Sequence, residues 1–272
     1  MIASLHHLSI AARSFDEAAR AYAVLLDREP VGVSQVDGAR AVWFALSNVA
    51  LRIVAPDGAG AAGDAVRARL AQAGEGLWEM AFATDDLARA ARTCARRALE
   101  AAQVDMDAGP RETARGLRLS ESATHGVPIA ILQAQPLRSE GPTIDVLDHV
   151  VIGTPNPGRA VELYGGRLGL DMRLDRTNAA WGARLIFFRC GDTIVEIAHA
   201  LKNAAADKPD GFGGVSLRAH DIDKARARYL AAGLNVSEVR TGRREGTQVC
   251  TVRTGTLGVP TILIGGVKRV FS

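Results

Sequence analysis

Apolar residues recur along this chain at two spacings, and the two alternate in a fixed order. Short apolar runs of strand length are followed by polar turns and then by segments with apolar residues three and four positions apart, the spacing of one buried helix face. Ser14 and Glu17 have the spacing of a capping box, which predicts that the first helix begins there. The buried positions expected of the first two helices are Phe15, Ala18, Ala19, Tyr22, Leu25 and Leu26, and Leu87, Ala90, Ala91, Cys94 and Leu99. This alternation predicts an α+β protein.

The two halves of the chain repeat the same order of elements. Residues 5–18 and 147–160 share an opening Leu-x-His, a short apolar strand, a turn and a helix, so that His7 corresponds to His149. Two further pairs of segments correspond in the same way: residues 40–54 with 184–198, and residues 111–128 with 243–260. Self-similarity of this extent indicates a duplicated architecture.

Each half also repeats internally, because the segments that begin near residues 76 and 211 again read as a strand, a turn and a helix. We therefore expect four βαβββ modules that pair into two domains. The expected N-terminal domain is 1–135, with modules 1–56 and 76–135, and the expected C-terminal domain is 146–272, with modules 146–200 and 211–272. Pro and Gly in the connecting segments 136–145 and 56–76 support these boundaries.

Composition excludes several classes of function. With 47% hydrophobic and 23% charged residues among 272, the chain has ordinary globular composition, and a net charge of +3 with scattered arginines argues against nucleic-acid binding. No apolar run approaches the roughly 18 residues of a membrane span, and the first residues do not resemble a leader, so we expect no membrane partner and a cytoplasmic protein. The three separated cysteines favour neither disulfides nor a zinc site, and no phosphate-binding glycine loop implies a nucleotide cofactor.

The segments LDHVVIGTPNPGRAVELY and GDTIVEIAH resemble the vicinal oxygen chelate superfamily, which includes glyoxalases, bleomycin resistance proteins and extradiol dioxygenases. The resemblance covers nearly the whole chain. It implies that two modules form a curved, half-closed sheet around a cavity, and that the first and fourth strands of a module supply the ligands of a divalent metal.

At those ligand positions the third module carries His149 and Glu196. Side chains on neighbouring strands stand about 4.8 Å apart, close enough to share one ion such as Fe, Mn, Zn or Mg. Glu196 lies in the apolar strand TIVEIA, where a carboxylate costs several kcal/mol to bury unless it is paired. We therefore expect Glu196 to be both a ligand and a catalytic group; an ion pair with Arg184 or Arg189 is the alternative.

Two of the other modules match the ligand pattern poorly. The resemblance places Gly214 and Ile264 at the ligand positions of the fourth module, and neither residue can bind a metal. In the first module His7 stands with Arg52, whose charge would repel a cation.

The second module offers Glu79, with Leu132 at its other ligand position. If the second and third modules shared a cavity, Glu79 would join His149 and Glu196 in a set with one histidine and two carboxylates, suited to Mg, Mn or Fe. His7 and Glu79 are therefore the weaker metal candidates, and the sequence leaves the pairing of modules open.

Two further residues are candidates for contact with a ligand. Trp181 and Arg184 could clamp a planar anion, since an indole offers a stacking face and a guanidinium pairs with carboxylates. The alternative is a core tryptophan beside a surface arginine. Arg243 and Arg244 follow in a glycine-rich turn, where we expect them to be solvated.

We therefore expect a small-molecule enzyme of the glyoxalase or dioxygenase type, a lyase, isomerase or dioxygenase in which a metal binds vicinal oxygens of the substrate. The alternative is a metal-free protein of the same fold that sequesters a hydrophobic or planar compound, and Gly214 and Ile264 favour it. A structural scaffold fits less well, because an unpaired charge in strand TIVEIA indicates a site. The sequence leaves open the substrate, the reaction and the oligomeric state, and it is compatible with a homodimer.

Overall fold

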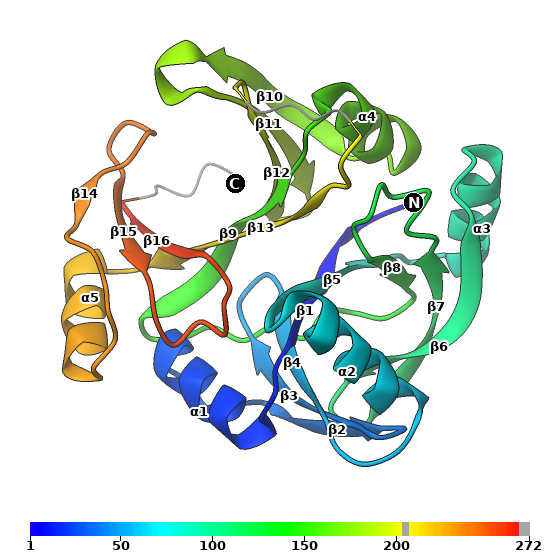
Figure 1. Cartoon of the computed structure of the whole chain (residues 1–272), viewed down its shortest axis with the longest axis horizontal. Coiled ribbons are helices and arrows are strands. Elements are labelled where there is room, and N and C mark those ends of the chain that lie inside the picture. Colours follow the sequence, from blue (N-terminus) through cyan, green and yellow to red (C-terminus); the bar gives the residue numbers. More distant parts are fainter. Residues whose placement is uncertain (203–206, 267–272) are drawn as a thin grey trace.

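The computed structural model describes residues 1–202 and 207–266 and contains four modules, each with a strand, a helix and three further strands (Figure 1). The first module comprises β1 (Ser4–Ala11), α1 (Phe15–Leu26), β2 (Gly32–Val36), β3 (Ala39–Ala45) and β4 (Ala50–Pro56). After α2 (Ala61–Ala73), the second comprises β5 (Gly76–Ala83), α3 (Leu87–Arg96), β6 (Ala101–Gly109), β7 (Glu112–Leu119) and β8 (Ile129–Leu132). The third comprises β9 (Ile144–Gly153), α4 (Pro157–Val161) with the π-helical η1 (Glu162–Arg167), β10 (Asp171–Asn178), the 3-10 turn η2 (Ala179–Trp181), β11 (Ala183–Cys190) and β12 (Thr193–Ala200). The fourth comprises β13 (Gly211–Ala219), α5 (Ile222–Ala231), β14 (Arg240–Thr241), β15 (Gln248–Val252) and β16 (Thr261–Gly265).

The helix that follows the first strand of each module begins at a polar residue that caps it. The side chain of this residue accepts the backbone N–H three positions on, which satisfies one of the donors that a helix leaves unpaired. The four capping residues are Ser14, Asp86, Asn156 and Asp221. Their repeated position gives a structural landmark that aligns the four modules. No helix in the described ranges is long and apolar enough to cross a membrane.

The strands form two eight-stranded sheets, in the orders β2-β3-β4-β1-β5-β8-β7-β6 and β10-β11-β12-β9-β13-β16-β15-β14. Each sheet joins consecutive modules, because β1 pairs antiparallel with β5 and β9 with β13. The predicted α+β fold of paired βαβββ modules is therefore confirmed. The alternative pairing of the second and third modules is wrong: Glu79 lies on β5 in the first sheet, whereas His149 and Glu196 lie in the second.

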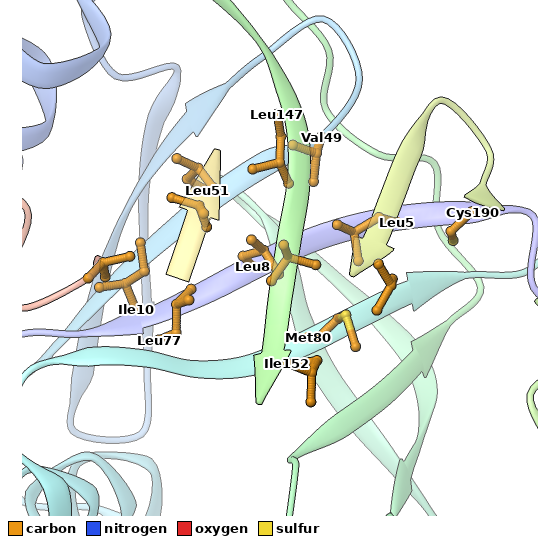
Figure 2. Close-up of a cluster of buried hydrophobic side chains, with 14 of the residues drawn as sticks. Leu5, Leu8, Ile10, Val49, Leu51, Leu77, Met80, Leu147, Ile152 and Cys190 are labelled. Carbon is orange, nitrogen blue, oxygen red and sulfur yellow. The ribbon is translucent and has the colours of Figure 1, made fainter. Parts of the chain in front are cut away.

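The two sheets share one hydrophobic core. Alternation along β1 points Leu8 and Ile10 into this core, and Figure 2 shows Leu8 between Leu147 of β9 and Met80 of β5, with Ile152 of β9 next to Met80. Burying each side chain of this kind contributes roughly 1.5–3 kcal/mol. Because a single cluster includes residues of both sheets, a division of the chain into two domains at 136–145 stays a prediction.

Asn48, in the turn between β3 and β4, ties the first sheet to the second. Its side-chain amide donates to the Leu147 carbonyl at 2.9 Å and to Thr193 Oγ1 at 2.9 Å, and its Oδ1 accepts the Leu147 N–H at 3.0 Å. The side chain is buried, so these bonds take the place of the hydrogen bonds to water that the amide loses on folding. A residue of the first half of the chain thereby holds β9 and β12 of the second sheet in place at Leu147 and Thr193.

The inner faces of the two sheets differ. The edge strands β2 and β6 of the first sheet lie side by side, and Ser34 Oγ donates to Asp107 Oδ2 at 2.6 Å between them. Trp43 is fully buried on this inner face and donates to Ser34, while α2 covers Ala41 and neighbouring residues. The inner face of the first sheet is thus filled, whereas that of the second sheet encloses a cavity.

Candidate functional site

His149 of β9 and Glu196 of β12 face the cavity of the second sheet, and their side chains meet there. The two strands pair in parallel, with His149 beside Ile194 and Glu196 beside Val151, so the two residues occupy diagonal positions on neighbouring strands. His149 Nε2 lies 3.2 Å from Glu196 Oε2. The structure therefore brings together the two residues that the sequence singled out, and a shared metal remains a prediction.

A β-bulge adds a second carboxylate to this pair. The register between β9 and β13 shifts by one residue at Asp148, so that Asp148 and His149 both face the cavity although they are adjacent in sequence. Asp148 Oδ2 lies 2.9 Å from His149 Nδ1, and Arg218 Nε of β13 donates to Asp148 Oδ1 at 2.6 Å. The imidazole is therefore held between two carboxylates, one at each ring nitrogen.

Burial and charge pull against each other in this cluster. Burial disfavours the imidazolium of His149, but the hydrogen bond with Asp148 and the charges of Glu196 and Asp148 outweigh it and raise the pKa of His149. Burial raises the pKa of Glu196, and the positive charges of His149 and Arg243 offset only part of this. The pKa of Asp148 is lowered, because its bonds to His149 and Arg218 outweigh the effect of burial. The pKa values of His149 and Glu196 are thus both raised, so each group favours its protonated form. Perturbed pKa values of this kind are typical of functional sites.

The cavity has a volume of about 940 Å³, within the range of roughly 300–1,000 Å³ that small-molecule sites occupy. Much of its wall is apolar, and these residues come from six strands: Val151, Leu174, Leu185, Phe187, Ile194, Val249, Ile262 and Ile264. The polar cluster of Asp148, His149 and Glu196 lies on one wall. A few polar groups in an apolar cavity of this size suit a small organic ligand.

Trp181 lies at the wall of the cavity, and two arginines contact its ring. Asn178 Oδ1 accepts the Trp181 N–H at 3.3 Å, and Gly182 takes a left-handed conformation (φ 63°), which together turn the chain between β10 and β11. The guanidinium carbons of Arg176 and Arg243 lie 5.0 and 4.8 Å from the indole centroid. Trp181 therefore lies where a ligand-binding residue was expected.

Arg184 does not lie in the cavity, contrary to the sequence-based expectation. Phe187 and Leu185 of β11 face the cavity, and alternation along the strand points Arg184 to the opposite face of the sheet. There it forms a bidentate ion pair with Asp175, at 2.9 and 2.6 Å, which lowers the pKa of that carboxyl. Glu196 consequently pairs with His149 and not with Arg184.

Five arginines and two carboxylates of the cavity lining were not recognised in the sequence. Arg243 and Arg244, expected to be solvated, line the cavity together with Arg176, Arg218, Arg240 and Glu245. The position of Arg243 and Arg244 depends on how the turn after β14 folds back, which residue spacing does not reveal. The second carboxylate is Asp148. Asp148 precedes the predicted ligand His149 directly, but only the bulge turns it to the same face.

The first sheet places the weaker metal candidates differently. His7 is 1% exposed, packs edge-on against Trp43 at 5.1 Å and has its Nδ1 2.8 Å from Nδ1 of the buried His6. Burial holds the pKa of His7 well below its usual value, with the charges of His6 and Arg52 acting in the same direction. Glu79 is paired with Arg118 at 3.6 Å. These contacts disfavour a cation in the first sheet.

The helix caps and strand registers also correct two assigned positions. Counted back from their caps, Gly214 and Glu79 correspond to His149, as expected. Because Glu196 pairs with Val151, its counterpart in the fourth module is Ile262, beside Ser216, and not Ile264. The same argument replaces Leu132 with Ala130, beside Ala81, in the second module. The fourth module thus has no metal ligand at these two positions, and a Cβ added at Gly214 (φ 136°) would lie 2.3 Å from the Pro260 carbonyl oxygen and clash with it.

Residues 148–251, which contain most of this site, match the model of the Glyoxalase/Bleomycin resistance protein/Dioxygenase superfamily. This match lies in the second half of the chain and agrees with the resemblance of its sequence to the vicinal oxygen chelate superfamily. No curated protein matches this chain significantly in sequence.

Solved structures of similar fold cover nearly the whole chain. A triple mutant of 4-hydroxymandelate synthase from Streptomyces coelicolor matches with a TM-score of 0.73 and 14% identity, covering 98% of this chain and 94% of that one. A Mn(II)-bound glyoxalase from Novosphingobium aromaticivorans matches with a TM-score of 0.70 and 14% identity, covering 99% and 84%. BphC, a halotolerant catechol dioxygenase, matches with a TM-score of 0.67 and 12% identity, covering 100% and 90%. At these identities the likeness establishes the fold, and the function has to be argued from the site.

Proposed function

We propose that the cavity of the second sheet is the active site of a small-molecule enzyme of the glyoxalase or dioxygenase type, in which His149 and Glu196 hold a divalent metal ion. The observation that carries the proposal is the 3.2 Å distance between His149 Nε2 and Glu196 Oε2. Two ligand atoms about 2.1 Å from one ion, at roughly a right angle, lie about 3 Å apart. The donor pair therefore fits a shared ion, and its imidazole and carboxylate suit Fe, Mn, Zn or Mg.

The surroundings of His149 support this assignment. Histidines that bind metals commonly donate their other ring N–H to a carboxylate, which fixes the tautomer. Asp148 is in that position at Nδ1 and is itself held by Arg218. A neutral imidazole with its proton on Nδ1 would offer the lone pair of Nε2 to a metal ion beside Glu196.

A bound divalent ion would act as a Lewis acid and stabilise negative charge on substrate oxygens. The residues of the chain would do the rest. His149 and Glu196 would leave most coordination positions for water or for two oxygens of the substrate. Burial favours the protonated carboxyl of Glu196, so this group could also accept a proton from the substrate. The apolar wall would exclude water from the reacting atoms.

One observation favours a second candidate function, a metal-free protein that sequesters a hydrophobic or planar compound. Gly214 and Ile262 contribute no ligand, and the described part of the chain contains no group of three or more His, Cys, Asp and Glu that could hold a metal. In that case His149 would carry a proton between Asp148 and Glu196, and the site would be a purely organic binding cavity.

Metal content separates the two functions. The purified protein would be stripped with a chelator, reloaded with Mn, Fe, Zn or Mg one at a time, and analysed by mass spectrometry of its metals. We expect one ion per chain, lost on His149→Ala and Glu196→Ala and retained on Glu79→Gln, a carboxylate of the first sheet. Absence of stoichiometric metal would support the sequestering function, and full metal content in both site variants would refute the assigned ligands.

A further inference from the structure

The walls of the cavity carry more positive than negative side chains. The arginines are Arg176, Arg218, Arg240, Arg243 and Arg244, and the acidic residues are Asp148, Glu196 and Glu245. Arg218 is neutralised by Asp148 at 2.6 Å. Among the described residues, neither Arg176 nor Arg243 forms an ion pair, although other exposed arginines of the same half do, such as Arg173 with Asp171 and Arg184 with Asp175.

Arg176 and Arg243 come from opposite edges of the sheet and meet at Trp181. Arg176 lies on the edge strand β10, and Arg243 lies in the turn after the opposite edge strand β14. Both guanidinium groups lie within about 5 Å of the Trp181 ring centroid, a distance at which cation–π attraction contributes roughly 0.5–1 kcal/mol at exposed sites. The indole therefore holds the two charges in place before any ligand arrives, while their hydrogen-bond donors remain available.

These charges line the same cavity as the polar cluster. Arg176 and Arg243 share its lining with His149 and Glu196. Other lining residues are apolar, Ile262 and Phe187 among them. A ligand that fits must therefore combine an anionic group with an apolar body.

We propose that the cavity binds an amphipathic organic carboxylate whose carboxylate is held by Arg176 and Arg243, beside the Trp181 ring, and whose apolar body extends toward His149 and Glu196. This inference rests on the proposed function, because it assigns a substrate class to the same cavity. It does not depend on a metal, since neither Arg176 nor Arg243 is a proposed metal ligand.

The test uses a matched pair of probes, 3-phenylpropanoate and 3-phenylpropanamide, which have the same shape and differ in charge. Binding to the full chain in the presence of chelator would be followed by tryptophan fluorescence; Trp43 and Trp78 belong to the first sheet, so the change would report on Trp181. We expect the carboxylate to bind at least tenfold more tightly than the amide and than inorganic sulfate, which lacks the apolar body, because charge-assisted hydrogen bonds to two guanidinium groups are made only by the acid.

Arg243→Gln and Arg176→Gln should each weaken binding of 3-phenylpropanoate about tenfold, whereas the control Arg173→Gln, on the same strand as Arg176, should not change it. Trp181→Phe should remove the fluorescence change. Equal affinity for acid and amide, sulfate binding as tight as that of the acid, wild-type affinity in both site variants, or a persisting signal in Trp181→Phe would each overturn the inference. His149→Ala should keep the preference for the acid, so a failure of the metal proposal would leave this result unaffected.

Discussion

His149 has a fixed partner at each ring nitrogen, and this determines its chemistry. Asp148 is bonded to Nδ1, so the proton of a neutral imidazole resides there and the lone pair of Nε2 is free to bind a metal. Glu196 faces Nε2 from the neighbouring strand. A metal ion would take the place of the proton that His149 and Glu196 otherwise share. The cluster therefore suits both the metal-bound and the metal-free protein.

Asp148→Asn tests the importance of this orientation. An amide can present its NH₂ to Nδ1 and favour the wrong tautomer, so we expect the affinity for Mn²⁺ to fall about 10- to 100-fold, the usual effect of removing a carboxylate partner from a metal-binding histidine. Isothermal titration of the chelator-treated protein would measure this. Asp171→Asn, an exposed residue of β10, is the matched control, and equal affinity in Asp148→Asn and the control would exclude an orienting role for Asp148.

At the scale of elements, the sequence repeat predicted the site residues that regular strand pairing brings together. It missed the site residues that a β-bulge or a turn brings to the cavity. His149 and Glu196 could be found because the first and fourth strands of the first and third modules align without a gap, and the register of β9 and β12 then brings the two side chains together. The opposite orientation of Arg184 was also readable, since Phe187 pairs with Glu196 and alternation then turns Arg184 away. Asp148 could not be found, because a one-residue bulge is not encoded in apolar periodicity. Arg243 could not be placed either, since its position depends on the fold of a turn.

The turn that carries Asn48 has a structural role of its own. Asn48→Ala would leave the Leu147 N–H and carbonyl and Thr193 Oγ1 without their partner at a buried junction between the sheets. We expect the free energy of unfolding to fall by roughly 2–4 kcal/mol, because buried polar groups left unsatisfied cost about 1–3 kcal/mol each. Urea denaturation would measure the loss. Ser47→Ala, which removes one part-buried bond to Asp145, should cost less than about 1.5 kcal/mol, and a similarly small loss in Asn48→Ala would show that the junction does not depend on this side chain.

At the scale of the whole molecule, two similar sheets have different interiors. The first is filled by Trp43, by the Arg52–Asp107 ion pair at 2.9 Å and by α2, whereas the second encloses the cavity. Burying a charged pair is costly, and such a pair is tolerated where its hydrogen-bonding groups have partners. Here Asp107 accepts hydrogen bonds from both Arg52 and Ser34. We infer that the first half supports the second through the shared core and the Asn48 junction.

The proposed function requires that one ion binds between His149 and Glu196 in the second sheet. Anomalous diffraction from crystals soaked in Mn²⁺ would locate this ion. We expect one peak about 2.0–2.2 Å from both His149 Nε2 and Glu196 Oε2, with His149 Nδ1 still bonded to Asp148 and no peak beside His7 or Glu79. Crystals saturated with Mn²⁺ that show no density between the two side chains, or whose only peak lies in the first sheet, would contradict it.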